Sequence, residues 1–136
     1  MRDARKQIVI ALISKLGEKL PAVSAYTIVP EKEYSYPYLY VSDIFQNDES
    51  NKTTKEYDYE LLVQVVHKGL TDKTVLYDNM NSVVSIIENR KDLTLTDDFV
   101  CEYLQLISTS EAEIQTDTGI EYIGLIRFRI LVSDIS

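Results

Sequence analysis

The spacing of hydrophobic residues predicts two amphipathic helices, one at residues 3–20 and one at residues 71–89. In both segments the hydrophobic residues recur every three or four positions, which places them on one face of a helix. Pro21 directly follows the first segment and ends it, and Thr71 with Asp72 supplies a hydroxyl and an acid typical of a helix start. The hydrophobic positions are Ala4, Ile8, Leu12 and Leu16 in the first helix and Leu76, Met80, Val83, Val84 and Ile87 in the second.

Alternation of hydrophobic and polar residues predicts strands in most of the remaining chain. The predicted strands are 25–29, 38–45, 57–67, 99–107 and 120–132, and residues 93–95 are compatible with a short further strand. In 57–67, the odd-numbered residues from Tyr57 to Val65 share one face. In 38–45, alternation puts one set on one face and the other set on or near the opposite face: Leu39, Val41 and Asp43 against Tyr38, Tyr40 and Ile44.

These elements predict an α+β fold in a single domain that covers residues 1–136. Two hairpins, with polar loops at 46–55 and 108–119, would build a mostly antiparallel sheet of about four to five strands. The two amphipathic helices would pack on one face of the sheet, because each has a single hydrophobic side. The opposite face would stay partly exposed, and Arg127 and Arg129 lie between Leu125 and Leu131 on it.

Charge and cysteine content restrict the classes of protein that fit. The net charge of −8 argues against a general nucleic-acid binder, which needs clustered lysine and arginine. The apolar run at 8–13 is far shorter than the roughly 20 residues that cross a bilayer, and the charges around it favour a helix over a secretion signal. A single cysteine, Cys101, excludes an internal disulfide and fits a reducing compartment. We therefore expect a protein made in a cytoplasm, with no membrane partner and no sequence-specific nucleic-acid partner.

Side chains with catalytic or metal-binding chemistry are scattered. His67 is the single histidine and has no neighbouring histidine or cysteine in the sequence with which to form a metal set or a nucleophile pair. Cys101 alternates with Tyr103 in a predicted strand, which is typical of a small core residue. The adjacent acids Asp97 and Asp98 lack the spaced oxygen ligands of a calcium loop. We predict no catalytic, cofactor or metal site, and a protein that is not an enzyme.

Tyrosine is the most frequent aromatic residue, with ten copies and no tryptophan. Tyrosines are enriched at protein interfaces, so those between residues 34 and 59 could be interface anchors. They also favour strands and pack well across them. The sequence leaves both interpretations open.

The layout as a whole resembles the tail terminator, or tail completion, proteins of long-tailed bacteriophages and prophages. The resemblance rests on the N-terminal helix and on the strand start Tyr36-Pro37-Tyr38-Leu39-Tyr40-Val41. It continues through a polar loop into the long strand 56–67, the long helix 71–89, and closing strands that end in Arg127-Phe128-Arg129-Ile130. It covers nearly the whole chain.

This resemblance implies a non-enzymatic virion protein of the phage tail, assembled in the bacterial cytoplasm. It implies a homo-oligomer, a hexameric ring, that caps the tail-tube protein, ends tube growth and presents a surface to the head-tail connector protein. DNA would pass through the ring. The resemblance implies no cofactor. Ring closure requires two different contact patches on each subunit. The candidate interface residues are Asp48, Glu49, Lys52, Lys55, Glu111, Glu113, Asp117, Arg127 and Arg129.

Two functions other than a terminator remain open at this point. A head-tail connector or neck protein can share a small α/β build of this kind. A cytosolic adaptor module would use the tyrosine-rich hairpin as its binding surface.

In the ring that the resemblance implies, several acids are candidates to line the channel and to keep DNA from binding to it: Asp48, Glu49, Glu111, Glu113 and Asp117.

Overall fold

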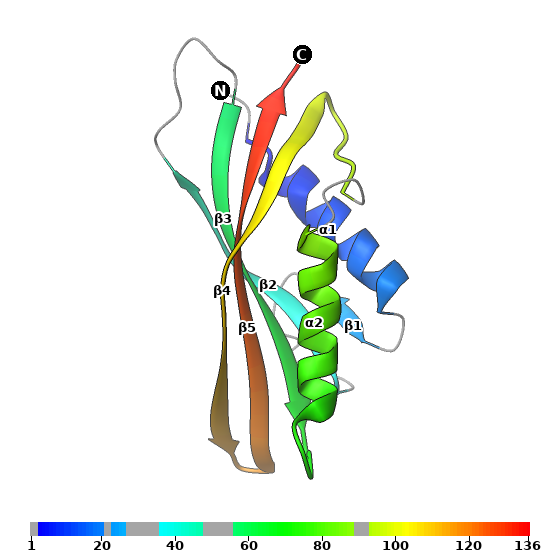
Figure 1. Ribbon diagram of the computed structural model, residues 1–136, viewed down its shortest axis with the longest axis vertical. Helices are drawn as coiled ribbons and strands as arrows, with labels where there is room; N and C mark the ends of the chain where they lie inside the picture. Colours follow the sequence, from blue (N-terminus) through cyan, green and yellow to red (C-terminus); the bar gives the residue numbers. More distant parts are fainter. Residues whose placement is uncertain (1–2, 21–22, 27–35, 48–55, 89–92) are drawn as a thin grey trace.

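A computed structural model describes residues 3–20, 23–26, 36–47, 56–88 and 93–136, and Figure 1 shows their arrangement. In chain order, the elements are α1 (Arg5–Lys19), β1 (Ser24–Tyr26), β2 (Tyr38–Asn47), β3 (Glu56–Lys68), α2 (Thr74–Glu88), β4 (Phe99–Thr116) and β5 (Gly119–Asp134). The predicted loop residues 48–55 and the end of the predicted strand at 27–29 lie outside the described residues.

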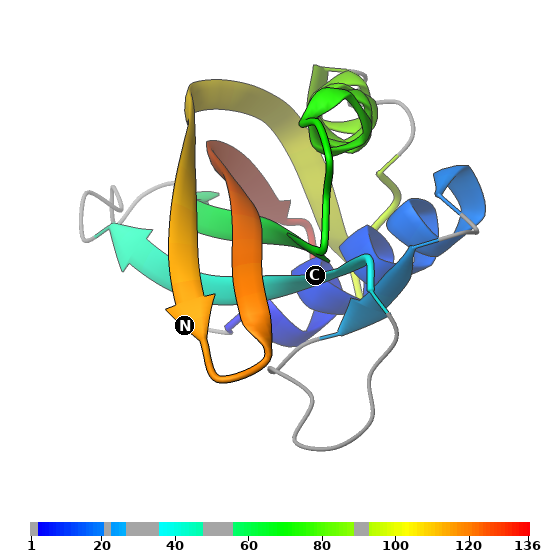
Figure 2. The same cartoon turned by 90° about the horizontal axis from the view of Figure 1, so that it is seen from below.

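The strands form one sheet in the order β1-β2-β3-β5-β4. The pairs β2–β3, β3–β5 and β5–β4 are antiparallel, and β1 pairs with β2 in parallel over residues 24–26. Figure 2 shows the strong twist and curvature of this sheet, with both helices on the same side of it. The predicted α+β class, with a mostly antiparallel sheet and helices on one face, is confirmed.

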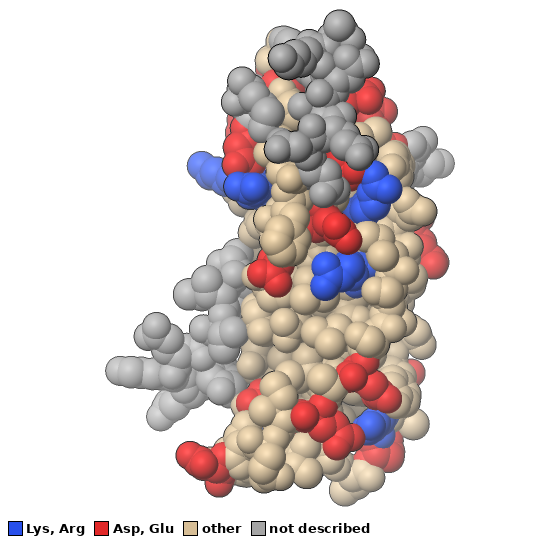
Figure 3. All heavy atoms as spheres, turned by 90° about the vertical axis from the view of Figure 1, so that its left-hand side faces the viewer, with Lys and Arg blue, Asp and Glu red and all other residues tan. Residues whose placement is uncertain are grey.

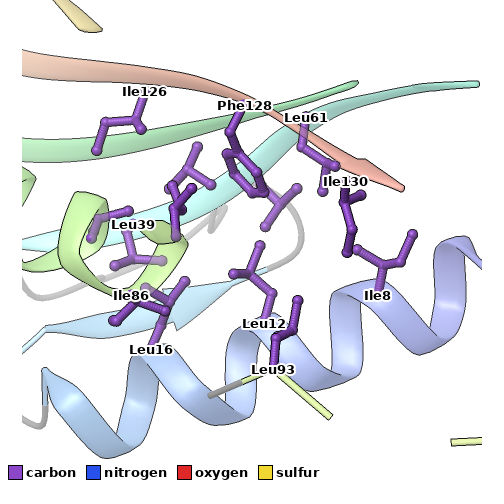
Figure 4. Packing of buried hydrophobic residues seen from close by; sticks show 14 of the residues in the cluster. Ile8, Leu12, Leu16, Leu39, Leu61, Ile86, Leu93, Ile126, Phe128 and Ile130 are labelled. Carbon is purple, nitrogen blue, oxygen red and sulfur yellow. The ribbon is translucent and has the colours of Figure 1, made fainter. Parts of the chain in front are cut away.

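The core lies between the helices and the inner face of the sheet, which is the face that the helices cover. Figure 4 shows Ile8, Leu12 and Leu16 of α1 pointing toward the strands, and Phe128 of β5 pointing into the space between. On β3, burial alternates as the sequence predicts, with Tyr57 through Val65 buried at the odd positions. The even positions of β5 from Ile126 to Val132 are buried in the same cluster.

A bulge in β2 changes the face assignment that alternation predicts. The register with β3 shifts between Val41 and Asp43, so Ser42 is the extra residue, and its hydroxyl donates to the carbonyl of Leu62 at 3.2 Å. After the bulge, Ile44 packs against the core and Asp43 is exposed. The prediction that Asp43 shares the face of Leu39 and Val41 is therefore wrong, because an inserted residue reverses the alternation.

The hairpin of β4 and β5 is much longer than predicted. Residues 108–116 continue strand β4, and the turn between the strands is confined to Asp117 and Thr118. The sequence from Ser108 to Thr116 is polar because this part of β4 is an edge strand and mostly exposed, and exposure favours polar residues in strands as well as in loops. The predicted loop at 108–119 is wrong for this reason.

Two smaller boundaries also differ. Residues 93–95 are not a strand, although Leu93 and Leu95 are buried against the core. α2 begins at Thr74 instead of Thr71, because the Asp72 carboxylate accepts hydrogen bonds from the Thr74 amide at 2.9 Å and from its hydroxyl at 2.5 Å. The acid predicted for the first turn therefore acts just before the helix.

The start of α1 depends on a buried hydrogen bond from the sheet. The Ala4 amide donates to the Tyr59 hydroxyl at 3.0 Å, and both residues are fully buried. We expect Tyr59→Phe to lower the free energy of unfolding by about 1–3 kcal/mol, because it leaves a buried N–H group without a partner. Chemical denaturation measures this. Tyr77→Phe is the matched control, because its hydroxyl is exposed; an equal loss in both variants would contradict the assignment.

Close packing between α2 and β5 depends on a glycine. A Cβ atom at Gly124 would lie 2.5 Å from Sδ and 2.6 Å from Cγ of Met80, which is closer than real side chains approach. We expect Gly124→Ala to cost about 1–3 kcal/mol of unfolding free energy by overpacking. In a double-mutant cycle, Met80→Ala should reduce this cost by opening space. Strictly additive costs would show that the strain lies elsewhere.

Candidate interface surfaces

A ladder of ion pairs crosses the outer face of the sheet, which is the face turned away from the helices. β3 and β5 place Glu60 opposite Arg129 and Leu62 opposite Arg127, so each arginine reaches an acid two residues along β3 on the same face. Nε of Arg129 lies 3.3 Å from Oδ1 of Asp58, and its Nη2 pairs with Oδ2. Nη1 of Arg127 lies 4.0 Å from Oε1 of Glu60.

These pairs affect the charge that Arg127 and Arg129 present to solvent. The hydrogen bond to Asp58 and its negative charge raise the pKa of Arg129 above its ordinary value. Both arginines thus lie beside acids of the same subunit, and the outer face presents mixed charges. Figure 3 looks at this helix-free side, where basic and acidic side chains lie above a broad uncharged area.

The outer face also carries a small apolar cluster next to this ladder. Tyr38, Val66 and Ile123 are buried together on it, and Tyr36, Tyr40 and Leu125 pack against them. The rings of Tyr36 and Tyr38 are 5.5 Å apart, and Nζ of Lys68 lies 5.6 Å from the Tyr36 ring centroid. Tyr57 and Tyr59 are buried in the main core instead. The described tyrosines between residues 36 and 59 therefore pack mostly against neighbouring strands.

Glu111 and Glu113 lie on the opposite, helix-covered face of the hairpin. Nζ of Lys73 is 3.6 Å from Glu111 and 2.9 Å from Glu113, and the Tyr77 hydroxyl donates to Glu111 at 2.9 Å. The hydrogen bond to Glu113 raises the pKa of Lys73, and the bond to Glu111 raises that of Tyr77. The two acids therefore connect β4 to the beginning of α2. The prediction that they belong to a loop is wrong, because they lie within the paired part of β4.

The predicted interface residues fall into separate places. Arg127 and Arg129 share the outer face, Glu111 and Glu113 lie on the inner side, and Asp117 is exposed in the turn. The remaining four lie outside the described residues: Asp48, Glu49, Lys52 and Lys55.

Sequence reasoning missed the partners of these residues. Asp58 and Glu60 of β3 lie on the outer face beside Arg127 and Arg129 of β5. Lys73, which pairs with Glu113, lies just before α2. The signal that could have found the first two is the pairing of β3 with β5, since acids and arginines at alternate positions then meet on one face.

His67 is buried at the end of β3 and contacts α2. Its Nε2 lies 3.0 Å from Nδ2 of Asn79, which is consistent with a neutral imidazole that accepts this hydrogen bond. Burial lowers the pKa of His67 below 6.5, because the charged form loses its hydration. A structural role for His67 fits this position.

The buried His67 predicts acid-dependent stability. Since its pKa is lower in the folded state, the unfolded chain binds more protons below pH 6.5, so the free energy of unfolding should fall as pH decreases from that value. We expect His67→Gln to flatten this dependence, because glutamine still accepts a bond from Asn79 but does not titrate. Denaturation curves across this pH range measure it. Parallel pH profiles for both proteins would contradict the prediction.

The described residues include neither a metal-binding group of side chains nor a helix that could span a membrane. Within 3–20, 23–26, 36–47, 56–88 and 93–136, no group of three or more histidine, cysteine or acidic side chains is placed to hold a metal ion. In the same part of the chain, no helix is long and apolar enough to span a membrane. What the described surface provides is a charged outer face and a long edge hairpin.

Comparison with known proteins links this fold to virions. No protein-family model and no curated protein match the chain. Among solved structures, a chain of the "Virion of native gene transfer agent (GTA) particle" superposes with a TM-score of 0.77 at 15% identity, covering 98% of this chain and 99% of that chain. The chain therefore has, over almost its whole length, the fold of a chain in a gene transfer agent virion.

Proposed function

We propose that this chain is a non-enzymatic structural protein of a phage-type virion, acting as a single domain that caps the tail tube. As a ring, it would end tube growth and provide the surface that joins the tail to the head. The observation that carries the proposal is the full-length likeness to a virion chain, and the sequence resemblance to tail terminators supports the finer assignment.

The surfaces of the subunit suit a ring. A head-to-tail ring needs two different patches on each subunit. The outer face with Arg127 and Arg129 is one candidate, and the long β4–β5 hairpin is another. Their mixed charges favour an interface in which ion pairs are exchanged or extended between subunits.

A neck or head-tail connector protein is the second candidate, because the same virion likeness supports it. The two functions differ in their target. A terminator acts on the end of the tail tube, whereas a neck protein binds the head-side connector.

The test combines particle size with tube growth. We expect native mass spectrometry and electron microscopy of the purified protein to show rings of roughly six subunits. Added to polymerising tail-tube protein, it should shorten the tubes and appear at one tube end. A protein that stays monomeric at high concentration and leaves tube length unchanged would refute the terminator function. Rings that bind head connectors but leave tubes unchanged would favour the neck protein.

A further inference from the structure

The distal part of β4 is an exposed edge strand whose only charged residues, Glu111 and Glu113, are acidic. β4 is the last strand of the sheet, and from Ser108 to Thr116 it pairs with β5 without a register shift. This stretch contains no lysine, arginine or proline, and the bulges of β4 lie before it. Edge strands usually carry such residues or bulges, because their free N–H and C=O groups otherwise accept another strand.

A pocket beside this edge could receive a side chain. Its volume is about 310 Å³, and it lies between α2 and β4. Met80 and Val84 supply apolar surface. The lining residues are Tyr77, Met80, Asn81, Val84, Thr109, Ser110 and Glu111.

Two carboxylates continue the line of the pocket along the strand. Thr109, Glu111 and Glu113 point to the same side of β4, because they pair with Ile126, Gly124 and Tyr122 on the inner face of β5. The side chains of Glu111 and Glu113 are 41% and 50% exposed, so their oxygens remain accessible beside Lys73. A strand added at the edge would meet a partly apolar pocket and then two acids that share one lysine, a group with a net charge of −1.

We propose that the edge of β4 from Ser108 to Thr116 binds an extended segment of another protein by strand addition. The backbone of that segment would pair with β4. On the inner side, one of its apolar side chains would fill the pocket, and lysine or arginine at the following alternate positions would face Glu111 and Glu113. This proposal does not depend on the proposed function, because it requires neither a ring nor a tail tube.

Charge favours such a basic segment over a second copy of this chain. Two β4 edges paired with each other in antiparallel fashion would bring Glu111 and Glu113 close to the same acids of the other copy, and like charges across strands are destabilising. The net charge of −8 adds general repulsion between copies. A basic partner strand would instead be attracted to the acids of this edge.

The test uses a short synthetic peptide in which threonine alternates with leucine at one end and with lysine at the other. We expect it to shift the amide signals of Ser108–Thr116 in NMR spectra of the full chain and to slow hydrogen exchange there. A peptide with glutamate in place of lysine should bind roughly tenfold more weakly or not at all. Equal binding of the two peptides, no binding of either, or shifts confined to other strands would overturn the proposal.

Charge reversal on the protein supplies the reciprocal test. Glu113→Lys should weaken binding of the lysine peptide by roughly tenfold and strengthen binding of the glutamate peptide. Glu121→Lys is the matched control, because it makes the same change in the same hairpin but on β5 and on the outer face; it should leave binding within about twofold. Protection of Ser108–Thr116 that rises with protein concentration without any peptide would assign this edge to a second copy and refute the proposal.

Discussion

Arg127→Glu combined with Arg129→Glu should abolish ring formation while the subunit stays folded. The change replaces two ion pairs by four acidic side chains on neighbouring strands, at Asp58, Glu60 and the two substituted positions. The Arg127–Glu60 pair lies near the surface and contributes about 0–1 kcal/mol to folding. Asp58 is only 14% exposed, so most of the loss of stability should come from Arg129→Glu, and the subunit should still fold. Association should weaken by roughly tenfold or more, because a like-charged face repels an acidic neighbour. Native mass spectrometry and circular dichroism measure the two effects.

A four-residue exchange separates the interface from the internal pairs. Adding Asp58→Arg and Glu60→Arg to the double variant restores opposite charges within the subunit but reverses their places on the outer face. If rings stay absent, the outer face itself contacts the neighbour. If rings return, the internal pairs matter only by maintaining the sheet. Normal rings in the original double variant would exclude this face as the contact.

Phe128→Ala should cause the largest loss of folding stability. Phe128 is fully buried on β5, opposite Leu61 of β3 and Leu106 of β4, and its ring points toward α1. Truncation of a buried phenylalanine costs about 3–5 kcal/mol, because apolar contacts are lost and a cavity remains. This is a large part of the total stability of about 5–15 kcal/mol that is common for a domain. Denaturant titration followed by circular dichroism gives the value.

Phe45→Ala is the matched control for Phe128→Ala. Phe45 is on β2, on the outer face, and its side chain is 54% exposed. Its truncation should change the unfolding free energy by no more than about 0.5 kcal/mol. Similar losses at Phe45 and Phe128 would mean that the core is not centred on the inner face of the sheet.

The hydrophobic pattern alone predicted both helices and most strands, since burial on one side leaves a regular mark in the sequence. The odd positions of β3 and the even positions of β5 from Ile126 to Val132 are buried as expected. The pattern failed where burial is weak or where regularity is interrupted. Residues 108–116 looked like a loop because an exposed edge strand is as polar as a loop, and Ser42 reversed the faces of β2 because a bulge leaves no clear mark in composition.

For the candidate sites, the sequence by itself determined which residues share a strand face, since side chains alternate along any strand. It thereby placed Arg127 and Arg129 on the partly exposed face. Only the tertiary structure decided which charges meet: the register of β3 with β5 brings Asp58 and Glu60 to the arginines, and the docking of α2 brings Lys73 to Glu111 and Glu113. Those contacts join residues far apart in the chain, and strand register and helix docking depend on the packing of the whole core.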